Sequence, residues 1–192
     1  MSYIDEIIEM GQADCGYVIS RNVKERGIPT VYLTRMVDGG MLNQLTNGIY
    51  ILPRYMEDEF YTCFLRYRRA VFSRRTALYL NGITNRQLEC IEANFPAGYN
   101  TTKIDGIRCY RICNDLYELG QTTAVTAFGH TVPVYNIERC ICDLFYYDDF
   151  DVEEKGYVIR CVDKSKIDYD KLFAYAKQMK VLPQVKSVFE VL

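Results

Sequence analysis

Side chains that can hydrogen-bond to nucleic-acid bases are concentrated in the segment PTVYLTRMVD, in the first quarter of the chain. A helix over this segment buries Leu33, Met36 and Val37 on one side, because residues three and four apart share a helix face. The guanidinium of Arg35, on the opposite side, can donate to both major-groove acceptors of guanine, and Val31 can contact a thymine methyl group. The other residues expected to project outward are Thr34 and Asp38, with Tyr32 at the flank. The pattern predicts a helix that reads base edges in duplex DNA.

Polar and basic side chains elsewhere in the first half suit contacts to phosphates, which position a protein on DNA without reading its sequence. The expected DNA-binding residues are Arg21, Asn22, Lys24, Thr30, Tyr32, Thr34, Arg35, Asn47, Arg66, Arg69, Arg74 and Arg75. The threonines among them can contact either bases or phosphates. The arginines from position 66 onward fit a solvated helix face as well as they fit a phosphate track.

Formal charge is distributed unevenly, although the net charge is only −2. Residues 20–86 contain 11 Lys/Arg and 5 Asp/Glu, which gives +6, whereas residues 91–192 contain 12 basic and 15 acidic residues, which gives −3. A positive region attracts a polyanion. The first half of the chain is therefore expected to face nucleic acid.

The elements that would position these side chains begin with two helices and a strand. Ser2 and Asp5 have the spacing of a capping box at the start of a first helix, and a short strand is expected over residues 16–19. Ser20 is expected to cap a second helix, which Gly27 ends in a left-handed conformation.

A third helix and a hairpin complete the order of a winged helix-turn-helix domain. Pro29 suits the first turn of the third helix, and Gly39-Gly40 stops it. The segments MLNQL and IYIL read as two strands, and the Asn47-Gly48 pair between them is a strong hairpin signal. The wing that this hairpin would form carries polar but uncharged residues, so it is a weaker candidate for phosphate binding than the helix.

The remainder of the chain is predicted to be a mixed α/β domain, which makes the fold class α+β. A helix is expected over residues 58–72, and SRRTALYLNGI favours a short helix that ends near Asn81-Gly82. The expected strands span residues 88–94, 107–113, 122–127 and 131–135. The expected helices include one capped by Asn136 and two over residues 168–179 and 184–192. The predicted domains are a winged helix-turn-helix at 1–56, connecting helices at 57–85 and an α/β domain at 86–192.

Residues capable of catalysis are few, and no enzymatic role is expected. The sequence contains no GxSxG motif, no Walker-type loop and no GxGxxG motif. His130 lies in a turn between expected strands, where a histidine without announced partners is usually structural. The carboxylate pairs Asp168/Asp170 and Glu138/Asp143 could hold Mg²⁺ for nuclease chemistry. Helix capping and the helix dipole account equally well for Asp168 and Glu138.

The eight cysteines predict neither a metal site nor a disulfide framework. They include no CxxC pair, and the closest spacing to a zinc site is Cys109 with Cys113. Free thiols that act as small hydrophobic side chains in a cytosolic protein are the expected state. No cofactor is expected.

Composition indicates a globular protein rather than a membrane or exported one. It is 49% hydrophobic and 25% charged, and no apolar run approaches the ~20 residues that span a bilayer. The N-terminal segment MSYIDEIIEM carries acids where a signal peptide carries bases. A cytoplasmic location is expected.

Four segments in order resemble the AbiEi antitoxins of bacterial type IV abortive-infection toxin–antitoxin systems. The winged segment with GGMLNQLTNGIYILP resembles their N-terminal domain, and SRRTALYLNGI resembles the helix that follows it. PVYNIERCICDLF resembles the segment of their second domain with a proline, a Glu-Arg pair and an aspartate. DYDKLFAYAKQMKVLPQVKSVFEVL resembles their C-terminal helices. The resemblance covers nearly the whole chain.

This resemblance implies a two-domain regulator. Its N-terminal domain would bind inverted repeats of double-stranded DNA in its own promoter and repress the operon. Its C-terminal domain would counteract a nucleotidyltransferase toxin without a stable complex. The motif match carries over to Glu138, Arg139 and Asp143, for which a helix cap and a buried ion pair are an equal alternative. Two other functions stay open: a winged-helix module that docks on another protein, and a divalent-metal nuclease.

Overall fold

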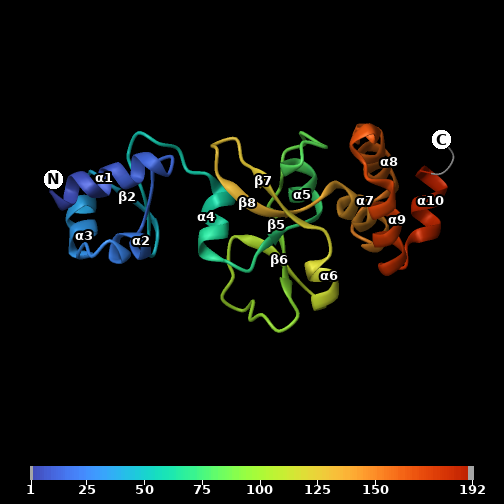
Figure 1. Cartoon of the computed structure of the whole chain (residues 1–192), viewed down its shortest axis with the longest axis horizontal. Coiled ribbons are helices and arrows are strands. Elements are labelled where there is room, and N and C mark those ends of the chain that lie inside the picture. Colours follow the sequence, from blue (N-terminus) through green and yellow to red (C-terminus); the bar gives the residue numbers. More distant parts are fainter. Residues whose placement is uncertain (1, 190–192) are drawn as a thin grey trace. The chain divides into compact units, whose positions relative to one another are not determined.

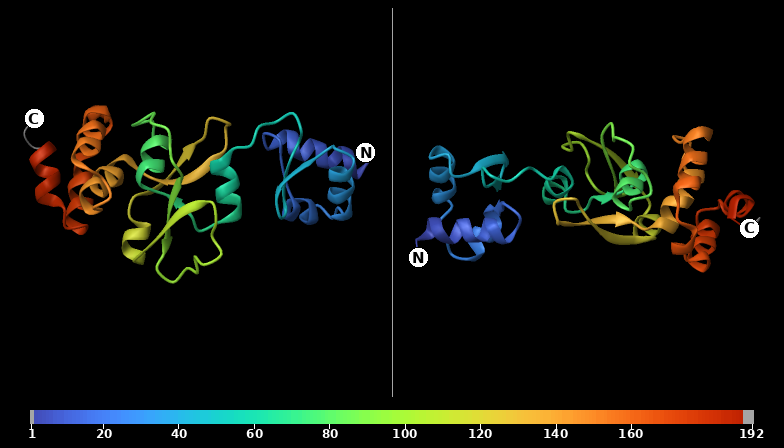
Figure 2. Two further views of the ribbon diagram at one scale, coloured as in Figure 1. Left: turned by 180° about the vertical axis from the view of Figure 1, so that it is seen from behind. Right: turned by 90° about the horizontal axis from the view of Figure 1, so that it is seen from above.

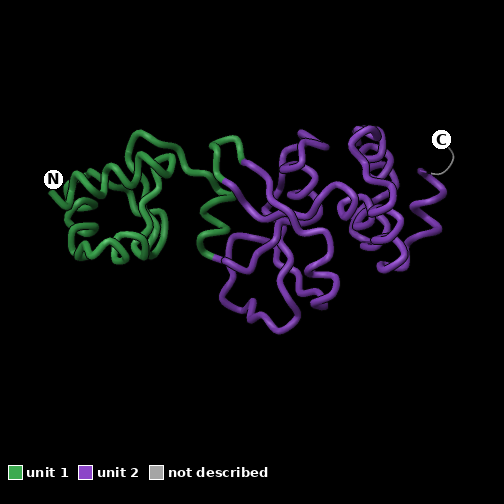
Figure 3. The backbone as a smooth tube through the Cα atoms, in the orientation of Figure 1, with its two compact units in different colours: residues 1–66, 126–130 green, residues 67–125, 131–192 purple. Residues whose placement is uncertain are grey.

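Helices and strands alternate along the chain largely as the local patterns predict. The computed structural model describes residues 2–189 and shows an α+β chain that divides into two units (Figure 3). Unit 1 comprises the chain up to Arg66 together with Thr126–His130, and unit 2 comprises Tyr67–Val125 and the chain from Thr131 onward. The predicted connecting region 57–85 is thus divided between the units rather than forming a separate part.

Unit 1 begins with the helix, strand and hairpin order predicted for residues 1–56 (Figure 1). Its elements are α1 (Tyr3–Ala13), β1 (Tyr17–Ile19), α2 (Ser20–Glu25), α3 (Val31–Asp38), β2 (Asn43–Thr46), β3 (Ile49–Ile51) and α4 (Glu59–Arg66). The strand β3 pairs antiparallel with β1 on one side and with β2 on the other.

Local signals set most of the element ends in unit 1. Ser2 and Asp5 form the predicted capping box, in which each side chain accepts a backbone N–H of the other residue. Gly27 has φ +75° directly after α2, as predicted for the residue that ends this helix. The prediction for Ser20 is wrong: α2 begins at Ser20 itself, and no side chain caps it because Ile19 occupies the N-cap position.

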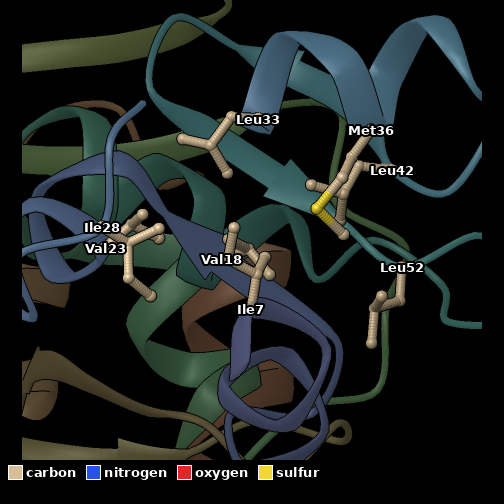
Figure 4. Packing of buried hydrophobic residues seen from close by; sticks show 8 residues of the cluster. All are labelled: Ile7, Val18, Val23, Ile28, Leu33, Met36, Leu42 and Leu52. Carbon is tan, nitrogen blue, oxygen red and sulfur yellow. The ribbon is translucent and has the colours of Figure 1, made fainter. Parts of the chain in front are cut away.

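The core of unit 1 lies where α1, α2 and α3 meet one face of the small sheet (Figure 4). Side chains from each of these elements are almost completely removed from water and fill the space between them. The buried cluster consists of Ile7, Val18, Val23, Ile28, Leu33, Met36, Leu42 and Leu52. This packing fixes the rotation of α3 about its axis, because two of its residues are anchored in the cluster.

The opposite face of the same sheet packs against α4. Successive strand residues point to opposite faces, so Tyr17 turns away from the cluster that contains Val18. Tyr17 joins Ile49, Ile51 and Leu65 in a second buried group. The helix α4 ends at Arg66, so the helix predicted over residues 58–72 is longer than the observed one.

Unit 2 contains a mixed sheet, seen from two further sides in Figure 2. Its strand order is β6-β5-β4-β8-β7. The strands are β4 (Val71–Phe72), β5 (Ile91–Pro96), β6 (Ile107–Ile112), β7 (Gln121–Val125) and β8 (Thr131–Tyr135). The predicted strands correspond to β5 through β8, with ends that differ by up to three residues. The central strand β4 is absent from the prediction because two residues are too short to show an alternating pattern.

The helices α5 (Arg74–Leu80) and α6 (Asn114–Glu118) contact strands of this sheet, and further helices follow toward the C-terminus. These are α7 (Ile137–Tyr146), α8 (Val152–Cys161), α9 (Tyr169–Gln178) and α10 (Leu182–Phe189), with a short 3-10 turn at Lys164–Lys166. Asn136 caps α7 and Asp168 caps α9, as predicted. The last residues of the helix predicted over 184–192 lie outside the described range. Within residues 2–189, no helix combines the length and apolar character needed to cross a bilayer.

Candidate nucleic-acid interface

The helix α3 presents the outward face that its sequence pattern predicts. Leu33 and Met36 are buried, and Val37 is half-buried at the edge of the core. The residues exposed on the other side are Val31, Thr34, Arg35 and Asp38. Met41 and Leu42 both donate their backbone N–H to the carbonyl of Met36, so the helix ends in a tight turn. The C-terminal end of the helix that carries the outward side chains is consequently fixed.

Arg35 keeps its hydrogen-bond donors available for an external acceptor. Within residues 2–189 its side chain forms no ion pair and donates no hydrogen bond. Its guanidinium carbon lies 5.6 Å from the centroid of the Tyr32 ring. Tyr32 in turn meets Tyr3 of α1 edge-on, with ring centroids 5.2 Å apart. Tyr32 therefore packs against the guanidinium of Arg35, and Tyr3 is a supporting residue that the sequence pattern does not reveal.

Most basic side chains in unit 1 lie in a short stretch of sequence around α2 and α3. Unit 1 contains 6 Lys/Arg and 9 Asp/Glu, so its formal net charge is −3. The positive excess predicted for residues 20–86 comes largely from arginines that belong to unit 2. Residues 20–37 nevertheless contain four basic side chains and only Glu25 as an acid. Electrostatic attraction to a polyanion is thus local to this stretch and not a property of the whole unit.

The helix α2 supplies the other basic side chains of this stretch. Arg21 and Glu25 form an exposed i,i+4 ion pair at 2.9 Å, with 82% and 59% of their side-chain surfaces in water. An exposed pair of this kind contributes little stability, so a phosphate can replace the carboxylate at small cost. Asn22, Lys24 and Arg26 are exposed. Arg26, directly after the helix, is a further candidate for phosphate contact.

The β2–β3 hairpin offers only uncharged polar groups. Gly48 adopts φ +78°, which the tight Asn-Gly turn requires, and Asn47 is exposed beside it. Asn43 and Gln44 are exposed along β2, and a register shift interrupts the pairing between Gln44 and Thr46. Hydrogen bonds from Asn47 to a phosphate are sterically open, but this hairpin carries no cation.

The four arginines predicted as a track do not lie on one helix. Arg66 is exposed at the end of α4 in unit 1, whereas Arg69, Arg74 and Arg75 belong to unit 2. The ring of Tyr117 lies 5.9 Å from the guanidinium of the exposed Arg69.

Burial removes Arg74 from the set of phosphate contacts. Only 4% of Arg74 is exposed, and its guanidinium lies between the rings of Tyr110 and Tyr147, at 3.2 and 3.7 Å from their centroids. Its Nε lies 2.9 Å from the Asp149 carboxylate, and Nη1 donates to the Asn94 side chain. The prediction fails because helix periodicity assigns a face but cannot show that strands cover it.

Arg75 is also occupied by partners within unit 2. Its Nη2 donates to Glu154 at 2.7 Å and to the Asp149 carbonyl at 2.6 Å, and its Nη1 lies 3.6 Å from the buried Glu92 carboxylate. These groups line a pocket of 480 Å³ at the edge of the sheet. The charged partners raise the pKa of Arg75 despite the desolvation that opposes it. Arg75 is thus a structural cation, and a phosphate would have to break several bonds to reach it.

His130 and its partners form a buried polar cluster in unit 1. The Asp58 carboxylate accepts hydrogen bonds from Thr126 Oγ1 at 2.5 Å and from His130 Nδ1 at 2.8 Å. The imidazole stacks on Tyr61, with centroids 4.0 Å apart and an interplanar angle of 6°. Because all three polar residues are buried, the cluster is a structural contact that holds residues 126–130. The sequence could not reveal it, since Asp58 and His130 are 72 positions apart.

Glu138, Asp143 and Asp168, three of the carboxylates considered for nuclease chemistry, each have a structural partner. Glu138 accepts the backbone N–H of Asp168 at 2.9 Å, and Asp168 caps α9. Arg139 and Asp143 form the predicted buried ion pair at 2.8 Å, and Arg139 also donates to the carbonyl of Leu119 at 2.9 Å. Across the described chain, no three His, Cys, Asp or Glu side chains gather into a potential metal site.

Comparison with known proteins yields a fold relationship but no family. Neither the family models nor the curated proteins contain a match to this chain. Among solved structures, the chain is similar to the RV2827C protein from Mycobacterium tuberculosis, with a TM-score of 0.57 and 11% sequence identity. The similarity covers 98% of this chain and 80% of that one. At this identity the relationship concerns the fold alone.

Proposed function

We propose that unit 1 is a winged helix-turn-helix domain that binds double-stranded DNA with α3 in the major groove. The supporting observation is the outward face of α3, on which Arg35 projects without a carboxylate partner among residues 2–189. An α-helix fits the major groove, and an arginine there can donate to both O6 and N7 of guanine. The α2 residues Arg21, Asn22 and Lys24 supply phosphate contacts that fix the orientation.

In this proposal the protein is a repressor of its own operon and the antitoxin of an abortive-infection system. The ordered resemblance to AbiEi antitoxins supports this part. The protein counteracts a nucleotidyltransferase toxin in the cytoplasm, and it does so without catalysis or a cofactor. Co-expression tests this part: a neighbouring gene whose product arrests growth alone, and not together with this protein, is the expected finding.

The DNA-binding part is tested by fluorescence anisotropy with a duplex from upstream of the gene. Arg35→Ala is expected to weaken binding to this duplex by roughly 5-fold to 150-fold, the equivalent of about 1–3 kcal/mol for one bidentate base contact. Binding to random DNA should change much less. Arg54→Ala is the matched control, because Arg54 is exposed in the turn after β3, outside α2 and α3. It should leave the affinity within about twofold.

Three results would redirect the proposal. An equal loss on specific and random DNA would make Arg35 a phosphate contact. An absence of binding to any duplex would favour a domain that docks on another protein. Cleavage of the duplex with Mg²⁺, lost on substitution of Asp143 or Asp168, would favour a nuclease.

A further inference from the structure

Val31 is an apolar residue at the outward face of α3 that the core does not use. It keeps 49% of its surface in water, whereas Leu33 and Met36 on the same helix keep 1% and 0%. The core of unit 1 is complete without Val31, which is absent from both buried clusters of the unit. The branched apolar group at this position therefore lies outside both buried clusters and is open to an external apolar partner.

Val31 and Arg35 lie on the same face one helical turn apart. Residues four apart in a helix are separated by about 6 Å along the axis, from a rise of about 1.5 Å per residue. Successive bases on a strand are about 3.4 Å apart, so the two side chains span roughly two base steps. Val31 is the first residue of α3, and the N-terminal residues of a recognition helix are those that contact base edges.

The chemistry of the two side chains differs in a way that duplex DNA can match. The guanidinium of Arg35 has donors for the O6 and N7 acceptors of guanine, and it has no internal acceptor among residues 2–189. The two methyl groups of Val31 have no hydrogen-bonding ability, and the only methyl group in the major groove belongs to thymine. Asp38, exposed at the far end of the helix, carries a negative charge that phosphates repel. The reading surface is thus the part of α3 from Val31 to Arg35.

We propose that α3 reads a thymine and a guanine within about two base steps of each other, with Val31 against the thymine methyl group and Arg35 on the guanine. This inference rests on the proposed function, because it requires α3 to lie in the major groove. Thr34 lies beside both side chains, and its hydroxyl can donate or accept, so it does not discriminate between bases. Val31 is then a specificity residue and not a source of general affinity.

The experiment removes the methyl group of one thymine from the DNA and, separately, the two methyl groups of Val31 from the protein. Duplexes bound by the full-length chain are selected from a randomised pool, and the consensus is expected to contain a thymine within two steps of a guanine. That thymine is then replaced by deoxyuridine, which differs only in lacking the methyl group. Wild-type affinity should fall about fourfold, the equivalent of about 0.8 kcal/mol for one buried methyl group. Val31→Ala should bind the thymine and deoxyuridine duplexes equally well.

A consensus without such a pair, or equal binding of both duplexes by the wild-type chain, would overturn the proposal. Continued discrimination by Val31→Ala would also overturn it. If the proposed DNA binding itself is wrong, no duplex is enriched from the pool, and this result distinguishes it from a failure of the thymine–guanine proposal alone. Replacement of a thymine outside the consensus controls for the effect of deoxyuridine on the duplex, and circular dichroism of Val31→Ala controls for the fold.

Discussion

Replacement of Asp58 by alanine should destabilise unit 1 through the loss of several buried hydrogen bonds at once. Oδ1 of Asp58 accepts the backbone N–H groups of Phe60 and Tyr61 at the start of α4, at 3.1 and 3.2 Å. Oδ2 accepts from Thr126 and His130 at 2.5 and 2.8 Å. Asp58 is fully buried, so water cannot replace the carboxylate without opening the structure.

The expected magnitude follows from these two roles. Loss of a helix cap costs about 0.5–2 kcal/mol. A buried donor left without an acceptor costs about 1–3 kcal/mol, and the substitution leaves two such side-chain donors. Partial relaxation of residues 126–130 lowers the sum, because these residues can move toward water. The free energy of unfolding should fall by about 3–5 kcal/mol, which is a large share of the stability of a typical domain.

Urea denaturation followed by tyrosine fluorescence measures this change. Glu57→Ala is the matched control, because Glu57 is the neighbouring acid, is exposed and accepts no capping bond. It should change the free energy of unfolding by less than about 0.5 kcal/mol. The reasoning about the cluster is refuted if Asp58→Ala and Glu57→Ala have the same effect.

Three further predictions concern unit 2, the buried thiols and the interface. Gly120→Ala should destabilise unit 2 by about 1–3 kcal/mol in thermal denaturation, because residue 120 has φ +78° and an added Cβ would lie 2.7 Å from Cβ of Arg139. Burial raises the pKa of the Cys63 and Cys142 thiols from 9.0 to about 12. The unfolded chain then loses these protons first, so the free energy of unfolding should fall as pH rises from about 9 toward 12, and Cys63→Ala should flatten that slope. Residues 20–37 contain four basic side chains, so a plot of log K against log salt concentration should have a slope no steeper than about −3.6 per bound chain; a much steeper slope would require cations from outside this stretch.

Patterns that depend on neighbouring residues could be predicted from the sequence. The outward face of α3, the capping box of Ser2 and Asp5, the cap at Asn136 and the turn at Gly48 all follow from residues within four positions of one another. The order of elements in unit 1 follows from the same local signals. These features are set by backbone geometry and by hydrogen bonds to nearby N–H groups, which the sequence displays directly.

Features that depend on distant partners could not be predicted. The helical spacing of apolar residues indicates which side of a helix is buried. It does not show that the rings of Tyr110 and Tyr147 enclose Arg74. The inclusion of residues 126–130 in unit 1 depends on Asp58, which no local pattern connects to His130. The positive charge counted over residues 20–86 is divided between the two units for a related reason, since a sum along the chain does not follow the division into units.

The most direct test of the central claim is protection of guanine N7 in the major groove from methylation by dimethyl sulfate. A duplex from upstream of the gene is treated with the reagent in the presence of the full-length chain, of Arg35→Ala and of Arg54→Ala, each at saturating concentration. If α3 lies in the major groove with Arg35 on a guanine, that guanine is protected by the wild-type chain and by Arg54→Ala, and it is methylated again with Arg35→Ala. A bound duplex on which every guanine N7 stays reactive, or on which Arg35→Ala protects the same guanine, would contradict this placement.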